Sequence, residues 1–258
     1  MILDEIAAKR RAQLRREMDA VPPEEVKRSA ARAAPPRDFT AALRKSGLSV
    51  IAEVKKASPS KGLICPDFHP AQIARRYETA GADAVSVLTE EAYFQGSSAA
   101  LREVRGAAEL PVLRKDFVID PYQIYEARAI GADAVLLIAV LLGPEKLREY
   151  KKTADSLGLA CLMEAHDEKE LGEVLSAGAE LVGVNNRDLR TFRVDLGTTE
   201  RLAALVPPSC VLVSESGFRT RADLGRAERT GAGAVLIGET LMRSGDTAAA
   251  LRKLRGAR

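Results

Sequence analysis

Apolar and polar positions follow two different periods along most of the chain. Continuous runs of valine, leucine and isoleucine alternate with segments of helical apolar spacing, such as 70–80, 121–130, 144–156, 167–177 and 219–230. The apolar runs predict strands at 50–55, 84–88, 111–115, 133–139, 159–164, 181–185, 210–215 and 234–238. Continuous apolar runs indicate strands buried on both faces, so the pattern predicts a parallel sheet with helical crossovers.

A short repeated motif favours a closed sheet. GADAV at Gly81 recurs at Gly131, and GAELV at Gly178 and GAGAV at Gly231 follow. Each Gly-Ala pair stands after a helical segment and before an apolar run, where glycine commonly ends a helix. Eight strand-helix units with internal repetition predict an α/β fold, a single (β/α)₈ TIM barrel over residues 49–258.

The first 48 residues precede this pattern and predict an N-terminal helical extension that packs on the barrel. Apolar residues at helical spacing over 2–18 share the segment with basic ones, Lys9, Arg10, Arg11, Arg15 and Arg16. We interpret the basic residues as a solvated face, because no aromatic residue is interleaved to stack on a base. Pro22-Pro23 and Pro35-Pro36 then interrupt the chain, and Asp38 is a candidate N-cap for a short helix.

Composition limits the class of protein and its partners. The chain has 258 residues, 46% of them hydrophobic, and a net charge of +3, which suits one domain and an acidic small molecule rather than nucleic acid. Its three cysteines form no disulfide or zinc pattern, and its longest apolar run, 134–142, is too short to cross a bilayer. We expect a cytoplasmic monomer without nucleic-acid or membrane partners.

Polar residues end several predicted strands, which in such a barrel is where chemistry takes place. The inward residues at these ends are Lys55, Lys115, Glu164, Asn185 (with Arg187 just beyond) and Glu215. Glu53 lies one layer below Lys55 on the same face. Charges that converge on one mouth are costly unless they are paired and used. We therefore interpret Lys115 and Glu164 as an acid/base couple, while a structural ion pair stays the alternative for Glu53 and Lys55.

Other residues near the strand ends indicate ligand contacts. A phosphate site is predicted from the loop that holds Ser58 and from two turns after the last strands, Ser216-Gly217 and Gly238-Glu239. The aromatic residues Tyr93, Phe94 and Phe117 suit either loop packing or a pocket for a flat ring. We interpret His69 and His166 as surface or helix-capping residues, and Arg114 and Asp116 as outward or loop partners of Lys115.

Seven motifs together carry a resemblance that covers essentially the whole chain. They are AEVKKASPSKG, LTEEAYFQGS, LRKDFVIDPYQI, MEAHDEKE, GVNNRDLRTF, VSESG and LIGETLMR. The chain resembles the indole-3-glycerol-phosphate synthase family. The resemblance implies a lyase of tryptophan biosynthesis that closes an indole ring on 1-(2-carboxyphenylamino)-1-deoxyribulose 5-phosphate. Carbon dioxide and water are released, and no cofactor or metal is needed.

The same resemblance implies roles for the site residues. Lys115 would be the general acid that protonates the substrate carbonyl, Lys55 would hold the departing carboxylate, and Glu164 would serve as acid/base in dehydration. Orienting and polar contacts would come from Glu53, Asn185 and Glu215. The phosphate would be bound by Lys55, Ser58, Ser216, Gly217, Gly238 and Arg187, with the backbone amide of Glu239 where some members carry serine. Phe94, Phe117 and the N-terminal extension would enclose the anthranilate ring.

Rival functions remain open at this level. A Schiff-base aldolase also needs a strand-end lysine and a phosphate site. A retaining glycosidase would use Glu164 and Glu215, although the chain has no Trp and 4% aromatic residues for sugar stacking. A non-catalytic barrel that binds phosphate ligands and an RNA-binding protein are further alternatives. Phosphoribosylanthranilate isomerases share the fold but lack the two strand-end lysines in this arrangement. The sequence leaves open which lysine donates each proton and in which direction Glu164 transfers one.

Overall fold

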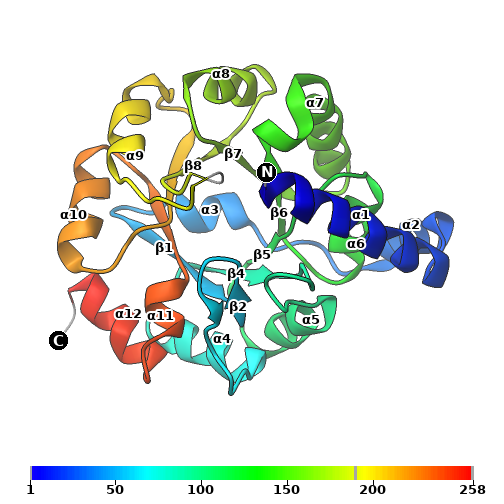
Figure 1. The fold of residues 1–258 in the computed structure, drawn as a ribbon, viewed down its shortest axis with the longest axis horizontal. Helices are drawn as coiled ribbons and strands as arrows, with labels where there is room; N and C mark the ends of the chain where they lie inside the picture. The colour runs from blue at the N-terminus through cyan, green and yellow to red at the C-terminus, as the bar shows by residue number, and fades with distance from the viewer. Residues whose placement is uncertain (1, 189–190, 257–258) are drawn as a thin grey trace.

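A closed barrel forms the body of the computed structural model, which describes residues 2–188 and 191–256; within these ranges eight parallel strands make the barrel (Figure 1). β1 pairs with both β4 and β10, which closes the sheet. The (β/α)₈ barrel predicted from the sequence is confirmed. The strands are β1 (Ser49–Val54), β4 (Ala84–Leu88), β5 (Val112–Lys115), β6 (Ala134–Ile138), β7 (Ala160–Ala165), β8 (Leu181–Asn185), β9 (Val211–Glu215) and β10 (Ala234–Ile237).

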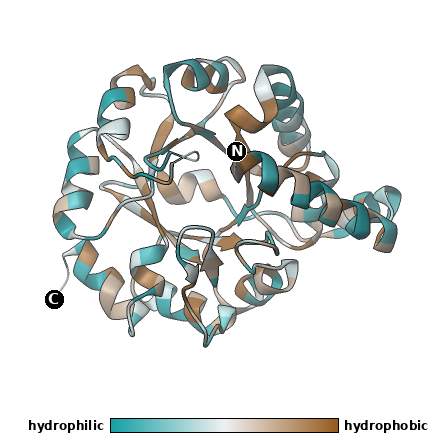
Figure 2. Cartoon of the chain, viewed as in Figure 1, coloured by the Kyte–Doolittle hydropathy of each residue, from teal (hydrophilic) through white to brown (hydrophobic). Residues whose placement is uncertain are grey.

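The strands divide their side chains between two cores. Ile51, Leu113 and Leu162 belong to the cluster that fills the barrel, whereas Val50 and Val54 pack in the larger cluster between strands and helices. Such a division follows from the alternation of side chains along a strand. Figure 2 shows apolar strands inside a ring of helices with mixed hydropathy. Lys115, Glu164 and Glu215 share the parity of the inward apolar residues, which sends them into the barrel mouth.

Helices surround the barrel. The four repeated glycines each stand between a helix and the strand that follows it. Gly81, Gly131, Gly178 and Gly231 all have positive φ, as expected for glycine after a helix. The helices are α4 (Pro70–Thr79), α5 (Ser98–Ala107), α6 (Tyr122–Ala129), α7 (Ala139–Ser156), α8 (Glu168–Ser176), α9 (Gly197–Leu202), the 3₁₀ helix η1 (Ala203–Leu205), α10 (Arg221–Arg229), α11 (Glu239–Met242) and α12 (Thr247–Arg255).

Two elements differ from the prediction for a local reason. α7 begins at Ala139 rather than near 144, because a kink at Gly143 (φ 69°, ψ 169°) joins a short apolar turn to the expected helix. A two-stranded hairpin, β2 (Ala57–Ser58) and β3 (Gly62–Leu63), occupies the loop after β1. No helix in the described ranges is long and apolar enough to cross a membrane.

Three helices precede β1: α1 (Ile2–Ala20), α2 (Pro23–Arg32) and α3 (Phe39–Leu43). Phe39 and Leu43 join the inner cluster at the N-terminal end of the barrel. Pro22-Pro23 was interpreted as a break, yet Pro23 is the first residue of α2, a position that proline favours because its missing N–H has no partner there. The interpretation of a solvated basic face is wrong for Arg10, whose side chain is 0% exposed.

Candidate active site

A cavity opens at the C-terminal mouth of the barrel, and the structure gathers all the predicted site residues around it. Its walls come from strand ends, from the loops that follow them and from Leu3 and Ile6 of α1. The predicted residues that line it are Glu53, Lys55, Ser58, Phe94, Lys115, Phe117, Glu164, Asn185, Arg187, Glu215, Ser216, Gly217, Gly238 and Glu239. Their positions follow from strand parity and from the barrel topology, which brings strand ends together.

Lys115 lies between two carboxylates at the centre of the site. Its Nζ is 3.2 Å from Glu164 Oε2 and 3.3 Å from Glu215 Oε2, so β5, β7 and β9 each contribute one group. Burial opposes the charge on Lys115, but Glu215 and Glu164 outweigh it and raise the lysine pKa above its ordinary value. Lys115 therefore holds a proton that it can donate.

The pKa values of the two buried glutamates shift in opposite directions. For Glu164 the opposing charge of Lys115 and a hydrogen bond from Asn185 outweigh burial and lower its pKa. For Glu215 burial dominates over Lys115, and the pKa rises from 4.5 to about 7. The site thus combines a protonated amine, an ionised carboxylate and a carboxyl that titrates near neutrality, which is a set suited to proton transfer.

A second ion pair lies at the end of β1. Lys55 Nζ is 2.6 Å from Glu53 Oε1, and both side chains are largely buried. Gly238, after β10, leaves room for this pair: a Cβ there would overlap Glu53 Oε1 and lie 2.9 Å from Lys55 Nζ. The ion pair that was the structural alternative for these two residues is therefore present, and both of its residues line the cavity.

The loops after β1, β8, β9 and β10 bring together groups of the kind that bind anions, the candidate anion-binding region. The Ser58 hydroxyl is buried without a hydrogen-bond partner among the described residues, and Ser216 and Gly217 have consecutive positive φ values of 68° and 98°. The Glu239 carboxylate lies 3.6 Å from Arg187 Nη2 and 3.9 Å from Lys61 Nζ. Cationic and hydroxyl groups from separate loops thus converge here, with one carboxylate between the cations.

Aromatic residues after β4 and β5 contribute an apolar wall to the cavity. The rings of Phe94 and Phe117 have centroids 6.1 Å apart and planes tilted by 41°. Leu3 and Ile6 of α1 extend this wall. Tyr93 is not among the lining residues; instead, Lys9 Nζ lies 4.5 Å from the centre of its ring. The wall suits a flat, largely apolar ligand group.

Comparison with known proteins identifies the family. A family model described as indole-3-glycerol phosphate synthase matches residues 3–254. The chain belongs to the indole-3-glycerol phosphate synthase family. An indole-3-glycerol phosphate synthase of Ruminiclostridium cellulolyticum is 54% identical over 258 residues, with 99% of each chain covered. One of Acetivibrio thermocellus is 48% identical over the same length, again with 99% of each chain covered.

Solved structures of proteins with other names share the barrel fold of this chain. A thiamine phosphate pyrophosphorylase from Pyrococcus furiosus matches with a TM-score of 0.62 and 17% identity over 81% of this chain and 94% of its own. A 3-hexulose-6-phosphate synthase matches with a TM-score of 0.64 and 15% identity over 81% of this chain and 99% of its own. At these identities the matches show a common fold.

One histidine beside the family's site was misjudged from the sequence. His166 Nε2 lies 3.4 Å from Glu164 Oε1, and Nδ1 lies 2.9 Å from Glu170 Oε2, so the interpretation as a surface or capping residue is wrong. Asp167 caps α8 instead. Burial opposes the charge on His166, but Glu170 and Glu164 outweigh it and raise the histidine pKa. A usable signal existed, because His166 has the parity of Glu164.

Other residues outside the predicted set also lie near the site. Lys61 lies beside Glu239 of the candidate anion-binding region, and its place before a glycine in the loop after β1 was a signal for it. Arg114 and Asp116, the chain neighbours of Lys115, are both buried and paired with each other at 3.1 Å. His69 does stand at the start of α4, with its side chain 57% exposed. Among the described residues no group of three His, Cys, Asp or Glu side chains could hold a metal ion.

Proposed function

We propose that this enzyme converts 1-(2-carboxyphenylamino)-1-deoxyribulose 5-phosphate into indole-3-glycerol phosphate, carbon dioxide and water. The observation that carries the proposal is the placement of Lys115 between Glu164 and Glu215, in one cavity with an anion-binding region and an aromatic wall. Membership of the indole-3-glycerol phosphate synthase family supports the same reaction, a carboxy-lyase step of tryptophan biosynthesis.

The first half of the reaction needs an acid at the substrate ketone. The ring carbon that bears the carboxylate attacks the ketone carbon, and Lys115 donates a proton to the ketone oxygen as the carbon-carbon bond forms. Lys55 holds the carboxylate until it leaves as carbon dioxide, and the electrons of the broken bond restore the aromatic ring. Glu53, 2.6 Å from Lys55, holds the lysine Nζ in place at the cavity wall.

The second half is a dehydration. The new hydroxyl takes up a proton and leaves as water, while the neighbouring carbon loses a proton to form the pyrrole ring. Glu164, 3.2 Å from Lys115, is the group we assign to this exchange, with Asn185 and Glu215 orienting the intermediate. Over both halves one proton is consumed for each carboxylate released.

The substrate phosphate would lie opposite the aromatic ring. We assign it to Lys55, Ser58, Ser216, Gly217, Gly238 and Arg187, because they line the cavity from the ends of β1, β8, β9 and β10, which are neighbours in the barrel. The carboxylate of Glu239 already pairs with Arg187, so we assign its backbone amide rather than its side chain to the phosphate. The substrate's anthranilate ring would then pack on Phe94, Phe117 and α1.

The proposal also covers the partners, location and oligomeric state of the enzyme. We assign it a small phosphorylated substrate, no cofactor, no nucleic-acid or membrane partner, a cytoplasmic location and a monomeric state. The aldolase alternative is less well supported, since a lysine whose pKa is raised keeps its proton and is a poor nucleophile for an imine.

Indole fluorescence tests this reaction directly, because the chain contains no Trp that would mask the product. Purified protein in EDTA is mixed with the substrate, alongside Lys115→Ala, Glu164→Gln and the exposed control His69→Ala. We expect the wild type and the control to form indole, and the two site variants to lose at least about 100-fold in kcat, a typical loss for removed acid/base groups. Substrate binding without an indole signal in the wild type would contradict the function and favour a ligand-binding barrel.

A further inference from the structure

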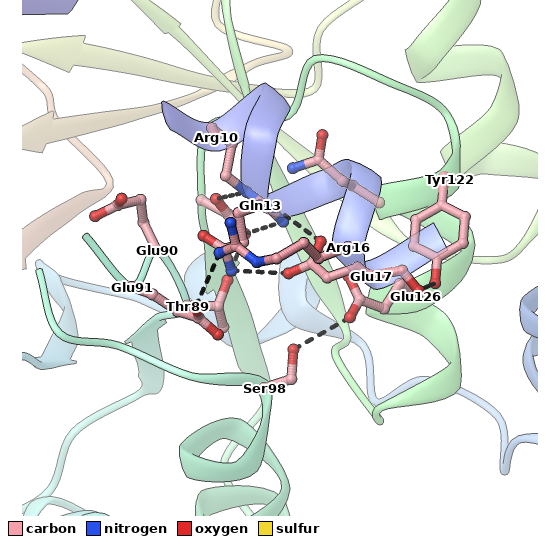
Figure 3. A network of polar contacts seen from close by, with 12 residues as sticks. Arg10, Gln13, Arg16, Glu17, Thr89, Glu90, Glu91, Ser98, Tyr122 and Glu126 are labelled. Carbon is pink, nitrogen blue, oxygen red and sulfur yellow. Dashed lines mark hydrogen bonds and ion pairs between the residues drawn. The ribbon is translucent and has the colours of Figure 1, made fainter. Parts of the chain in front are cut away.

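Arg10 is a buried cation on the N-terminal helix, and nothing in the proposed chemistry uses it. Its Nε and Nη2 donate to the two oxygens of Asp116 at 2.9 and 3.1 Å, and its Nη1 donates to Glu17 at 2.8 Å. Figure 3 shows Arg10 and Glu17 of α1 in one polar network with Thr89, the residue that follows β4. Two parallel bonds from a guanidinium fix both the distance and the orientation of its partner.

Asp116 connects this contact to the catalytic segment. It directly follows Lys115, and its carboxylate also accepts from Thr89 Oγ1 at 2.7 Å and from the Phe117 N–H at 2.8 Å. The Thr89 N–H in turn donates to the Lys115 carbonyl at 3.1 Å. The Asp116 carboxylate, which accepts two hydrogen bonds from Arg10, therefore also fixes the backbone that carries Lys115 and Phe117.

The two halves of α1 are anchored differently. In the C-terminal half, Leu14 packs with Val26 and Tyr122 in a separate apolar cluster, and the Tyr122 hydroxyl donates to the Glu17 carbonyl at 3.3 Å. In the N-terminal half, Leu3 and Ile6 line the substrate cavity. Arg10 lies between the halves and ties α1 to the strand-end segment after β5.

We propose that Arg10 is a positioning residue for the reaction, which holds the N-terminal half of α1 over the cavity and fixes the segment that carries Lys115 and Phe117. The proposal rests on the proposed function for its rate measurements. A purely structural role is the competing explanation. It predicts a lower free energy of unfolding for variants of Arg10 but an unchanged kcat for each folded molecule.

The chain offers a matched set of variants. Arg10→Met removes the contact, yet Asp116 keeps Arg114 and Thr89 as partners, so no buried carboxylate is left without a cation. Arg10→Lys keeps the charge but cannot bond both oxygens with a planar fork. Arg16→Met removes an equal charge from the same helix at an exposed position, 69% exposed and 4.0 Å from Glu91.

We expect kcat for each folded molecule to fall about 100-fold in Arg10→Met, because a displacement near 1 Å at the reacting groups has effects of that size. KM rises by a smaller factor than kcat falls, since the ring loses part of its contact with α1 while the phosphate contacts, on the loops after β1, β8, β9 and β10, stay in place. Arg10→Lys recovers part of the loss and stays roughly tenfold below the wild type, because one bond replaces two. Arg16→Met stays within about twofold of the wild type, as for other exposed pairs. Circular dichroism and thermal melting give the folded fraction.

Several outcomes would overturn the proposal. Wild-type kcat in folded Arg10→Met, or an equal loss in Arg16→Met, would leave Arg10 a structural role only. If Arg10→Met does not fold, an unchanged kcat in Arg10→Lys would likewise overturn it. If the wild type forms no indole, the proposed function fails by itself, and hydrogen exchange of residues 2–9 in Arg10→Lys decides whether Arg10 holds this half of α1.

Discussion

Glu215 shows how burial and neighbouring charges set the state of one residue. It shares Lys115 with Glu164, and one lysine cannot compensate two buried carboxylates equally. Burial is the largest contribution, and with the nearby carboxylates it raises the pKa of Glu215 from 4.5 to about 7. The carboxyl is therefore protonated over part of the pH range in which an unfolded chain would ionise it.

A pH-dependent loss of stability follows from this shift. Below pH 4.5 the group is protonated in both states, and above about pH 7 it is ionised in both. Between these values the unfolded state binds fewer protons, so the free energy of unfolding falls as pH rises. We expect the wild type to lose stability relative to Glu215→Gln across this window, measured by urea unfolding at successive pH values.

The control for this titration is an exposed carboxyl, Glu25→Gln on α2. Its difference from the wild type should show no comparable fall over the same window. A flat difference between the wild type and Glu215→Gln from pH 4.5 to 7 would mean that Glu215 is ionised throughout, with Lys115 compensating both carboxylates.

At the scale of elements, the repeated Gly-Ala turn also joins neighbouring strands. In the first copy the Asp83 backbone N–H donates to the Val50 carbonyl, while its carboxylate accepts from the Val50 N–H at 2.9 Å. Arg255 of α12 lies 2.8 Å from the same carboxylate. In the third copy Glu180 stands at the matching position, but its side chain is 64% exposed. A buried carboxylate therefore reinforces this turn in the first copy but not in the third.

We expect Asp83→Ala to lower the free energy of unfolding by about 2 kcal/mol, because it leaves the buried Val50 N–H without its side-chain acceptor and Arg255 without its partner. Glu180→Ala is the matched control and should cost less than about 0.5 kcal/mol, as is usual for exposed positions. Urea unfolding of both variants measures the difference. Equal losses would show that the turn contributes through its backbone bonds alone.

Elements were predictable where the pattern is local. The strand ranges and the inward parity of Lys115, Glu164 and Glu215 follow from apolar periodicity, so the barrel and the centre of its site could be derived from the sequence.

Three features could not be predicted in this way. α2 was missed because Pro22-Pro23 indicates a break as readily as a helix start. Arg10 was misjudged because its partner lies 106 positions away, and a helical pattern does not reveal which charge meets a distant carboxylate. His166 was misjudged because it lies between β7 and α8, and the sequence does not show whether a side chain there turns towards Glu164 or towards solvent.

At the scale of the whole molecule, the proposed phosphate site spans the closure of the barrel. Ser58 follows β1, Gly217 follows β9 and Gly238 follows β10, and β10 is the strand that pairs with β1. A phosphate bound by all three loops would link the first strand of the barrel to the last two. A ligand that binds only the native state stabilises the whole fold.

Indole-3-glycerol phosphate should therefore raise the melting temperature. At 100 times its dissociation constant it adds about 2.7 kcal/mol, which corresponds to roughly 5 °C for a chain of this size. Indole-3-glycerol without phosphate, at the same concentration, should give a much smaller shift, because it contacts the aromatic wall but leaves the three loops unlinked. Equal shifts for the two compounds in differential scanning fluorimetry would place the binding energy on the aromatic wall and α1. The loops after β1, β9 and β10 would then have no part in holding the barrel closed around its ligand.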